Sequence, residues 1–140
     1  MNSNLRSVVV ALALCWACIA SAADEPARAP GIGATIEAQI DAFLKDDFAR
    51  AFSFASPGIQ GLFGNHQRFG LMVRNGYPMV WRPSEVRFLR LREVKGALWQ
   101  RVLIRDRAGG VHLLDYQMVG IDGNWRINGV HILREPDVGT

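Results

Sequence analysis

The sequence predicts an α+β fold, in which amphipathic helices pack on one face of a curved antiparallel sheet. Apolar residues recur at helical spacing in the first half of the chain, whereas from Glu85 onward they alternate with polar residues in four runs. Turns of two to four residues separate these runs. Parallel neighbours need much longer crossover connections, so we expect an antiparallel meander of four strands or more.

Helix-capping residues divide the first half of the chain into short helices. Thr35 is the predicted N-cap of the first helix, whose apolar residues between Ile36 and Leu44 share one face. Asp46 and Asp47 predict the start of a second helix, because aspartate is a favoured N-cap. An acidic pair can also bind a metal, but no histidine stands at ligand spacing nearby, so the capping interpretation is favoured.

Further signals complete the helical half. Ser56 and Pro57 end the preceding helix and start a short helical turn, since proline is well tolerated at the first helical position. Asn65 is the predicted cap of the next helix, which Gly76 terminates. Residues 78–83 begin and end with proline and are expected to form an edge strand or an extended connector.

Each predicted strand has two faces, since side chains alternate along a strand. The strands span residues 85–94, 97–106, 111–121 and 124–133. The faces expected to point inward carry Leu98, Gln100, Val102 and Ile104 in the second strand, His112, Leu114, Tyr116 and Met118 in the third, and Trp125, Ile127, Gly129, His131 and Leu133 in the last. A bulge would reverse part of this assignment.

Polar side chains on these inward faces are candidates for lining a ligand cavity. The candidates are Gln100, His112, Tyr116 and His131, with Tyr77 and Trp81 at the mouth. Such groups can orient a ligand or transfer protons, or each can be a core residue whose polar atom is bonded to backbone or water. Asp115 stands in the middle of a predicted strand and is expected to face outward, paired with Arg101 or Arg126.

The first 22 residues have the features of a secretory signal peptide. Arg6 provides the positive region, residues 8–19 the apolar region and residues 20–22 the A-x-A site, so we expect cleavage after Ala22 and a periplasmic protein. The apolar region is too short to span a membrane, and no transmembrane segment is expected after cleavage. Cys15 and Cys18 both lie in this segment, which leaves the mature chain without a thiol nucleophile.

The remaining chain is expected to form one domain. Residues 23–34 contain two prolines and two glycines and predict a flexible lead, residues 35–134 form the domain and residues 135–140 a tail. The three histidines show no zinc spacing and there is no phosphate-binding loop, so neither a metal nor a cofactor is expected. The basic residues form no run, and nucleic acid is not an expected partner.

Several short motifs carry a resemblance to a known family. The motifs AFSFASP at 51–57, FGLMV at 69–73, GYPMVWRP at 76–83 and LLDY at 113–116 resemble an exported bacterial family called domain of unknown function 4864. The closing segment at 122–130 is similar to the cone-shaped α+β domains of the NTF2-like (cystatin-like) superfamily. That resemblance implies a cone-shaped sheet, but the superfamily includes ketosteroid-isomerase-like enzymes, dehydratases and noncatalytic binding modules, so the fold alone selects no function.

Two hypotheses for the function follow. The favoured one is a noncatalytic envelope protein that binds a small apolar ligand or a protein partner. The alternative is a small ketosteroid-isomerase-like or dehydratase-like lyase or isomerase, in which Asp115 or His112 is the general base and Tyr116 or Tyr77 stabilises an oxyanion. The position of Asp115 discriminates between them, because an arginine partner on the outer face would count against the enzyme.

The outer face of the sheet predicts a homodimer. If the inward assignments hold, Trp99, Leu103, Leu113 and Val119 form an exposed apolar patch on the two middle strands. Polar residues surround this patch, as they do at protein interfaces. In a competing arrangement, the N-terminal lead or residues 78–83 fold over the patch and leave a monomer.

Overall fold

The computed structural model of the protein describes residues 31–133, so the predicted signal peptide, most of the predicted lead and the predicted tail lie outside the described residues. The described chain contains helices α1 (Ile32–Leu44), α2 (Phe48–Ser53), α3 (Pro57–Phe63), α4 (His66–Gly76) and α5 (Pro78–Trp81), followed by strands β1 (Pro83–Val94), β2 (Ala97–Asp106), β3 (Val111–Ile121) and β4 (Asn124–Leu133). No helix within residues 31–133 is long and apolar enough to cross a membrane.

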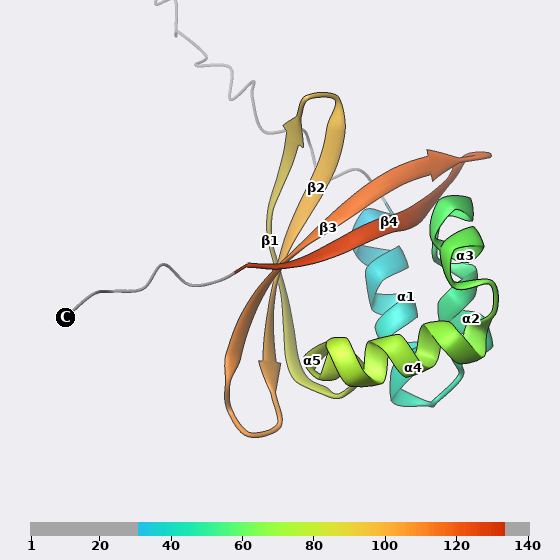
Figure 1. The fold of residues 1–140 in the computed structure, drawn as a ribbon. Coiled ribbons are helices and arrows are strands. Elements are labelled where there is room, and N and C mark those ends of the chain that lie inside the picture. The colour runs from blue at the N-terminus through green and yellow to red at the C-terminus, as the bar shows by residue number, and fades with distance from the viewer. Residues whose placement is uncertain (1–30, 134–140) are drawn as a thin grey trace, which may run out of the picture.

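The four strands form one antiparallel sheet in the order β1-β2-β3-β4. The helices lie together on one side of this twisted sheet (Figure 1). The predicted α+β class and the four-stranded meander are therefore confirmed. The strand bounds differ from the prediction only at β1, which begins at Pro83 rather than at Glu85.

The helix caps expected from the sequence are also present. The side chain of Asp47 accepts a hydrogen bond from the backbone N–H of Arg50 at the start of α2, over 3.1 Å. Ser56 caps α3 and Asn65 caps α4 in the same way. Each side chain satisfies a backbone donor that has no partner within its helix.

The start of α1 was predicted wrongly. The helix begins at Ile32, and Gly31 occupies the N-cap position, so Thr35 lies inside the first turns. Gly31 has φ 99°, a conformation that favours glycine, and the turn it makes buries Ile32 to 2% exposure. Residues 32–34, expected to belong to the flexible lead, are therefore helical.

Residues 78–83 do not form the expected edge strand or extended connector. Pro78 occupies the first position of α5, where its missing N–H costs nothing, and the helix runs to Trp81 before β1 starts at Pro83. Met79 and Val80 are both buried. Burial of these two side chains on one helical turn explains why the helix is preferred over an extended chain.

The inward faces of β2 and β3 were predicted correctly. Val102, Ile104 and Leu114 are fully buried, and Tyr116 and Met118 lie beside them in the core. In β4, however, a bulge shifts the register opposite Gln117 and Met118.

This bulge reverses the second half of β4. Ile127 pairs with Met118 and faces inward, but beyond the bulge Val130 pairs with the inward-facing Tyr116, while His131 pairs with the outward-facing Asp115. The expected inward positions of Gly129, His131 and Leu133 are therefore wrong.

Candidate functional site

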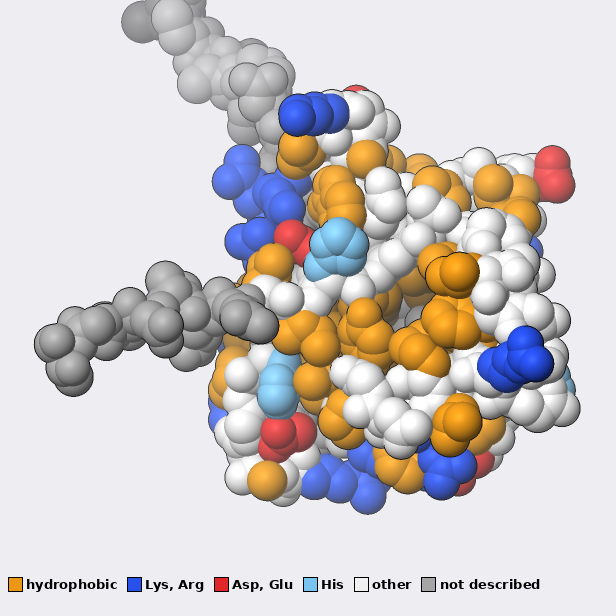
Figure 2. Space-filling model, in the orientation of Figure 1, with side chains coloured by type: hydrophobic (Ala, Val, Ile, Leu, Met, Phe, Trp, Pro, Cys, Tyr) orange, Lys and Arg blue, Asp and Glu red, His pale blue; other side chains and the backbone are white. Residues whose placement is uncertain are grey.

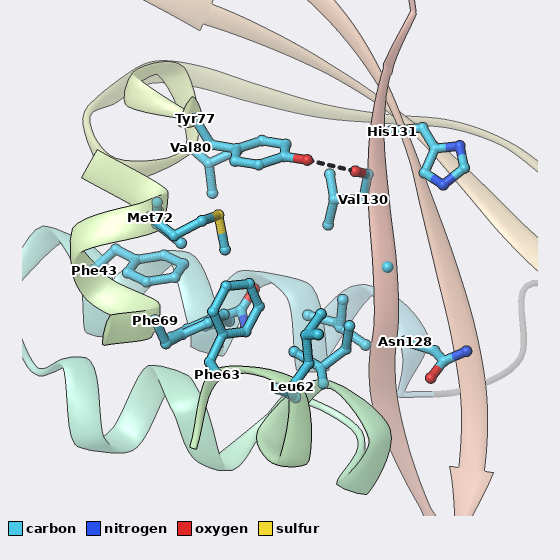
Figure 3. Close-up of a pocket in the computed structure, with 16 residues that line it drawn as sticks. Phe43, Leu62, Phe63, Phe69, Met72, Tyr77, Val80, Asn128, Val130 and His131 are labelled. Atoms are coloured by element: carbon cyan, nitrogen blue, oxygen red, sulfur yellow. Dashed lines mark hydrogen bonds between the residues drawn. The ribbon is translucent and has the colours of Figure 1, made fainter. Parts of the chain in front are cut away.

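The helical side contains a cavity of about 420 Å³ between α3, α4 and β4. Figure 2 shows this hollow edged by hydrophobic side chains, and Figure 3 shows the side chains that line it. The lining residues are Gln39, Phe43, Ala55, Ile59, Leu62, Phe63, Phe69, Met72, Val73, Tyr77, Val80, Ile127, Asn128, Gly129, Val130 and His131. Most of these side chains are aliphatic or aromatic, and no lysine, arginine, aspartate or glutamate is among them.

A cluster of phenylalanines builds the floor of the cavity. The ring of Phe69 lies 5.2 Å from that of Phe52, 5.9 Å from that of Phe43 and 5.8 Å from that of Phe63, measured between ring centroids. These distances fall in the range of favourable aromatic pairs. Phe69 therefore connects α1, α2, α3 and α4.

The other wall of the cavity is the edge strand β4. Residues 54–56 pair with it through hydrogen bonds from the N–H of Ser56 to the carbonyl of Ile127, 2.8 Å, and from the N–H of Ile127 to the carbonyl of Phe54, 2.9 Å. Ser56 Oγ also donates to the side chain of Asn128, 2.7 Å. These contacts hold the start of α3 against β4 and leave the cavity open further along the strand.

Tyr77 spans the cavity at its other end. Its hydroxyl donates to the carbonyl of Val130 over 2.9 Å, which links the end of α4 to β4 (Figure 3). A second polar side chain, Gln39, is buried and donates to the carbonyl of Ala51 over 3.1 Å. Since both side chains are already bonded to backbone, the cavity offers a ligand chiefly apolar contact.

Of the predicted ligand-binding side chains, Tyr77 is the one whose ring points into the cavity. The His131 backbone lies on the cavity wall, but its ring is on the far side of β4 (Figure 3), exposed and 5.1 Å from the ring of Trp99. Trp81 donates to Asp46 over 2.9 Å and stacks under the guanidinium of Arg82, away from the lining.

Gln100 and Tyr116 are core residues that do not line the cavity. Gln100 is buried and donates to the carbonyls of Leu89 and Arg101. Leu89 lies in the bulge of β1, so this hydrogen bond satisfies a backbone carbonyl there. Tyr116 is fully buried, and among the described residues its hydroxyl has no hydrogen-bond partner. Burial raises the pKa of this phenol, so it stays neutral.

Asp115 lies on the outer face, where two arginines hold it. Arg92 donates to both of its carboxylate oxygens over 3.0 and 2.9 Å, and Arg101 does so over 3.3 Å. Burial alone would raise the pKa of the Asp115 carboxyl, but the hydrogen bonds and charges of the two arginines outweigh it and hold the pKa below its ordinary value. The predicted partner Arg101 is correct, Arg126 makes no such contact, and Arg92 was missed.

His112 completes the set of candidate catalytic residues. Its Nε2 lies 2.8 Å from the carboxylate of Asp106 at the β2–β3 turn. This contact and the N–H groups of Gly110 and Ala108 lower the pKa of Asp106. Asp115 and Tyr116 are on opposite faces of β3, and His112 is bonded to Asp106, so the three do not form one site. Within residues 31–133, no group of histidine, cysteine, aspartate and glutamate is placed to hold a metal.

Comparison with known proteins assigns the chain to a family. Residues 25–140 match the family described as domain of unknown function 4864. The protein is a member of this family. No curated protein matches the sequence. A solved structure with a similar fold is the solution structure of a SEC-C motif containing protein from Rhodopseudomonas palustris, with a TM-score of 0.55 and 18% identity, over 74% of this chain and 80% of that chain.

The exposed apolar patch expected on the outer face of the sheet is not present in this member of the family domain of unknown function 4864. Trp99, Leu103, Leu113 and Val119 are half-buried, and none of them is among the exposed large apolar side chains. On this face those are Val94 and Val111, which pair with Ala97 and Arg105 and do not belong to the predicted patch. The homodimer therefore stays a prediction, without the exposed patch from which it was inferred. A monomer mass in sedimentation equilibrium would contradict it.

The hydroxyl of Tyr116 gives a direct test of the core geometry. A buried hydroxyl without a partner costs about 1–3 kcal/mol, so Tyr116→Phe is expected to leave the free energy of unfolding unchanged or to raise it by about 1 kcal/mol. Urea denaturation measures the difference. A loss of more than about 1 kcal/mol would mean that the hydroxyl makes a hydrogen bond in solution.

Proposed function

We propose that the protein is an exported, noncatalytic binding protein of the cell envelope, of the NTF2-like type, whose cavity between α3, α4 and β4 takes a small apolar ligand. The observation that carries this proposal is the cavity itself. Its volume of about 420 Å³ lies within the range of about 300–1,000 Å³ typical of ligand sites, and its lining is mostly apolar.

The polar groups of the cavity support a binding role. Tyr77 is fixed by its hydrogen bond to the carbonyl of Val130, so its hydroxyl oxygen presents its lone pairs in a defined direction. The Asn128 side chain lies on the other side of β4 (Figure 3), bonded to Ser56 and Gln117. A few oriented polar groups in an apolar lining are what confers orientation and specificity on a bound molecule. An uncharged ligand with an apolar body and one polar group fits this arrangement best.

The enzyme hypothesis has less support. Its general base Asp115 forms ion pairs with Arg92 and Arg101 on the face of the sheet that points away from the cavity. Tyr77 reaches the cavity but has no carboxylate or imidazole within it as a partner, because the ring of His131 lies across β4. Proton transfer needs a base within hydrogen-bond reach of the reacting group.

Export and a protein partner are the remaining parts of the proposal. The signal peptide predicted from the sequence of residues 1–22 supports a periplasmic location. Leu62 lines the rim of the cavity and is 74% exposed, so an apolar side chain of a partner protein could also enter there. The mass of the bound species, measured by native mass spectrometry, distinguishes a small ligand from a partner protein.

Filling the cavity tests the proposed function. Met72 lines it, and Leu71, its neighbour in α4, is 59% exposed and does not. Met72→Trp is expected to weaken binding of the uncharged fluorescent probe N-phenyl-1-naphthylamine by at least about tenfold, because the larger side chain occupies the volume the probe needs. A fluorescence titration measures the affinity.

Leu71→Trp is the matched control, since it adds the same indole one residue away. It should bind the probe as the wild type does. Equal affinities for the wild type and Met72→Trp, with both proteins folded by circular dichroism, would show that the probe binds elsewhere and would contradict the proposal.

A further inference from the structure

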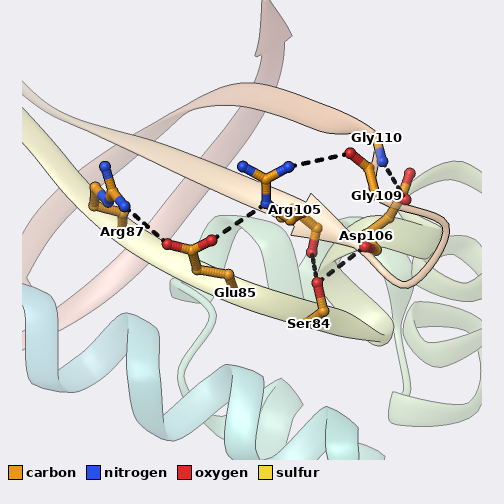
Figure 4. A network of polar contacts seen from close by, with 7 residues as sticks. All are labelled: Ser84, Glu85, Arg87, Arg105, Asp106, Gly109 and Gly110. Carbon is orange, nitrogen blue, oxygen red and sulfur yellow. Dashed lines mark hydrogen bonds and ion pairs between the residues drawn. The ribbon is translucent and has the colours of Figure 1, made fainter.

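The outer face of the sheet carries positive charge that its own carboxylates do not balance. None of the described helices covers this face (Figure 1). Two carboxylates on it are each shared between two arginines. Glu85 pairs with Arg87 over 2.9 Å and with Arg105 over 3.3 Å (Figure 4), and Asp115 pairs with Arg92 and Arg101.

Sharing one carboxylate between two guanidinium groups leaves one positive charge in each cluster. The Glu85 cluster is open to solvent, with side-chain exposures of 40% for Glu85, 64% for Arg87 and 45% for Arg105. A guanidinium has five N–H donors, so these arginines keep donors for a further anion. Arg105 uses one of them on the carbonyl of Gly109 (Figure 4).

Within residues 31–133, the surplus of positive charge is confined to one segment. Residues 83–107, here called the β1–β2 ribbon, contain seven basic and three acidic residues, a surplus of four. The rest of the described chain, residues 31–82 and 108–133, contains six of each. Figure 2 shows basic side chains gathered on the side of the molecule where Figure 1 places β1. The surplus thus comes from one segment of the sequence, and the fold spreads it along two paired strands.

Protection of a sheet edge does not account for this pattern. Charged side chains on an edge strand discourage pairing with other chains, which explains Arg87 and Arg92 in β1. However, β2 lies between β1 and β3 and has no free edge, yet it adds Arg101 and Arg105 to the same face. The ribbon is therefore built as a basic surface.

We propose that the β1–β2 ribbon docks on the anionic lipid headgroups of a membrane surface. The charges are spread along strands of 12 and 10 residues, over about 35 Å, rather than focused on one point, which matches an extended anionic surface. Guanidinium groups bind phosphate through paired N–H donors. Docking through this face leaves the cavity, on the helical side, open to solvent. The proposal is independent of the cavity's ligand.

Vesicle binding of the protein purified from envelope fractions tests this proposal. We expect binding to vesicles of phosphatidylcholine with phosphatidylglycerol at low salt, and none to phosphatidylcholine alone. Binding should be lost at about 1 M NaCl, where charges are screened beyond about 3 Å. The ribbon variant Arg87→Gln/Lys95→Gln/Arg107→Gln changes three exposed side chains and should bind on the order of 100-fold more weakly, at about fivefold per basic residue.

A helical variant provides the matched control. Lys45→Gln/Arg50→Gln/Arg68→Gln removes the lysine that caps the end of α1 and one arginine each from α2 and α4, and so has the same net charge as the ribbon variant. It should lose less than about fivefold. Equal losses of affinity in the two variants, or no binding to phosphatidylglycerol vesicles at low salt, would overturn the proposal. It would also be overturned if a second copy of the chain or an acidic protein, rather than lipid, occupied the outer face. If the triple ribbon variant does not fold, Lys95→Gln alone should still weaken binding about fivefold, and an unchanged affinity would overturn the proposal.

Discussion

Replacing Phe69 with alanine is expected to lower the free energy of unfolding by about 3–5 kcal/mol. The side chain is 5% exposed, and its ring contacts three other phenylalanine rings across the helical layer. Alanine removes these contacts and enlarges the cavity at its floor, and both effects destabilise the fold. Because domains of this size have unfolding free energies of about 5–15 kcal/mol, the variant should melt far below the wild type.

Leu62→Ala is the control for Phe69→Ala. Leu62 lines the same cavity but is 74% exposed, so its truncation should change the unfolding free energy by no more than about 0.5 kcal/mol. Urea denaturation of the two variants gives the comparison. Similar unfolding free energies for both variants would mean that the aromatic cluster does not hold the helices together.

Asp115→Asn is expected to lower the free energy of unfolding by about 2–4 kcal/mol. Breaking a buried ion pair by removing one charge costs about 3–5 kcal/mol, and the partial exposure of the arginines reduces this figure. The Asp115 side chain is 8% exposed, whereas Arg92 is 23% and Arg101 35% exposed. The amide can accept only part of the hydrogen bonds that the carboxylate accepts, so both arginines lose partners.

The matched control for Asp115 is Glu85→Gln. Glu85 is also shared between two arginines, but it lies in solvent, where ion pairs contribute little. Its replacement should leave urea denaturation nearly unchanged. Equal effects of the two substitutions would show that burial of the Asp115 cluster does not matter.

The pH dependence of stability provides a second test of Asp115. Its pKa is lower in the folded protein than in the unfolded chain, where an aspartate titrates near about 3.9. Its contribution is therefore fully present above about pH 4 and is lost as the pH falls through the folded pKa. The stability difference between the wild type and Asp115→Asn should be constant near neutrality and shrink below about pH 4.

Much of the fold could be predicted because its signals are local. Alternation over ten residues and turns such as Lys95-Gly96 defined the strands to within two residues, and Asp47, Ser56 and Asn65 cap helices as expected. Local signals failed where tertiary packing decided the outcome. Burial of Met79 and Val80 favoured α5 over an edge strand.

The candidate site could be predicted less well, because it depends on contacts between distant segments. One bulge in β4 moved His131 to the outer face, and no residue in the sequence marks its position. Arg92 in β1 contacts Asp115 in β3 across the intervening strand β2. Reasoning from pairs on adjacent strands does not suggest such a contact. The cavity lining joins α1 to β4, so Tyr77 could be identified as a mouth residue while its partner Val130 could not.

Native mass spectrometry of the protein purified from its own cell envelope tests the central claim, that the cavity takes a small apolar molecule. The wild type and Leu71→Trp should each carry additional mass that organic extraction removes, and Met72→Trp should carry none. If each of the three proteins, all folded, showed only the mass of its own chain and none bound N-phenyl-1-naphthylamine, the claim would be contradicted.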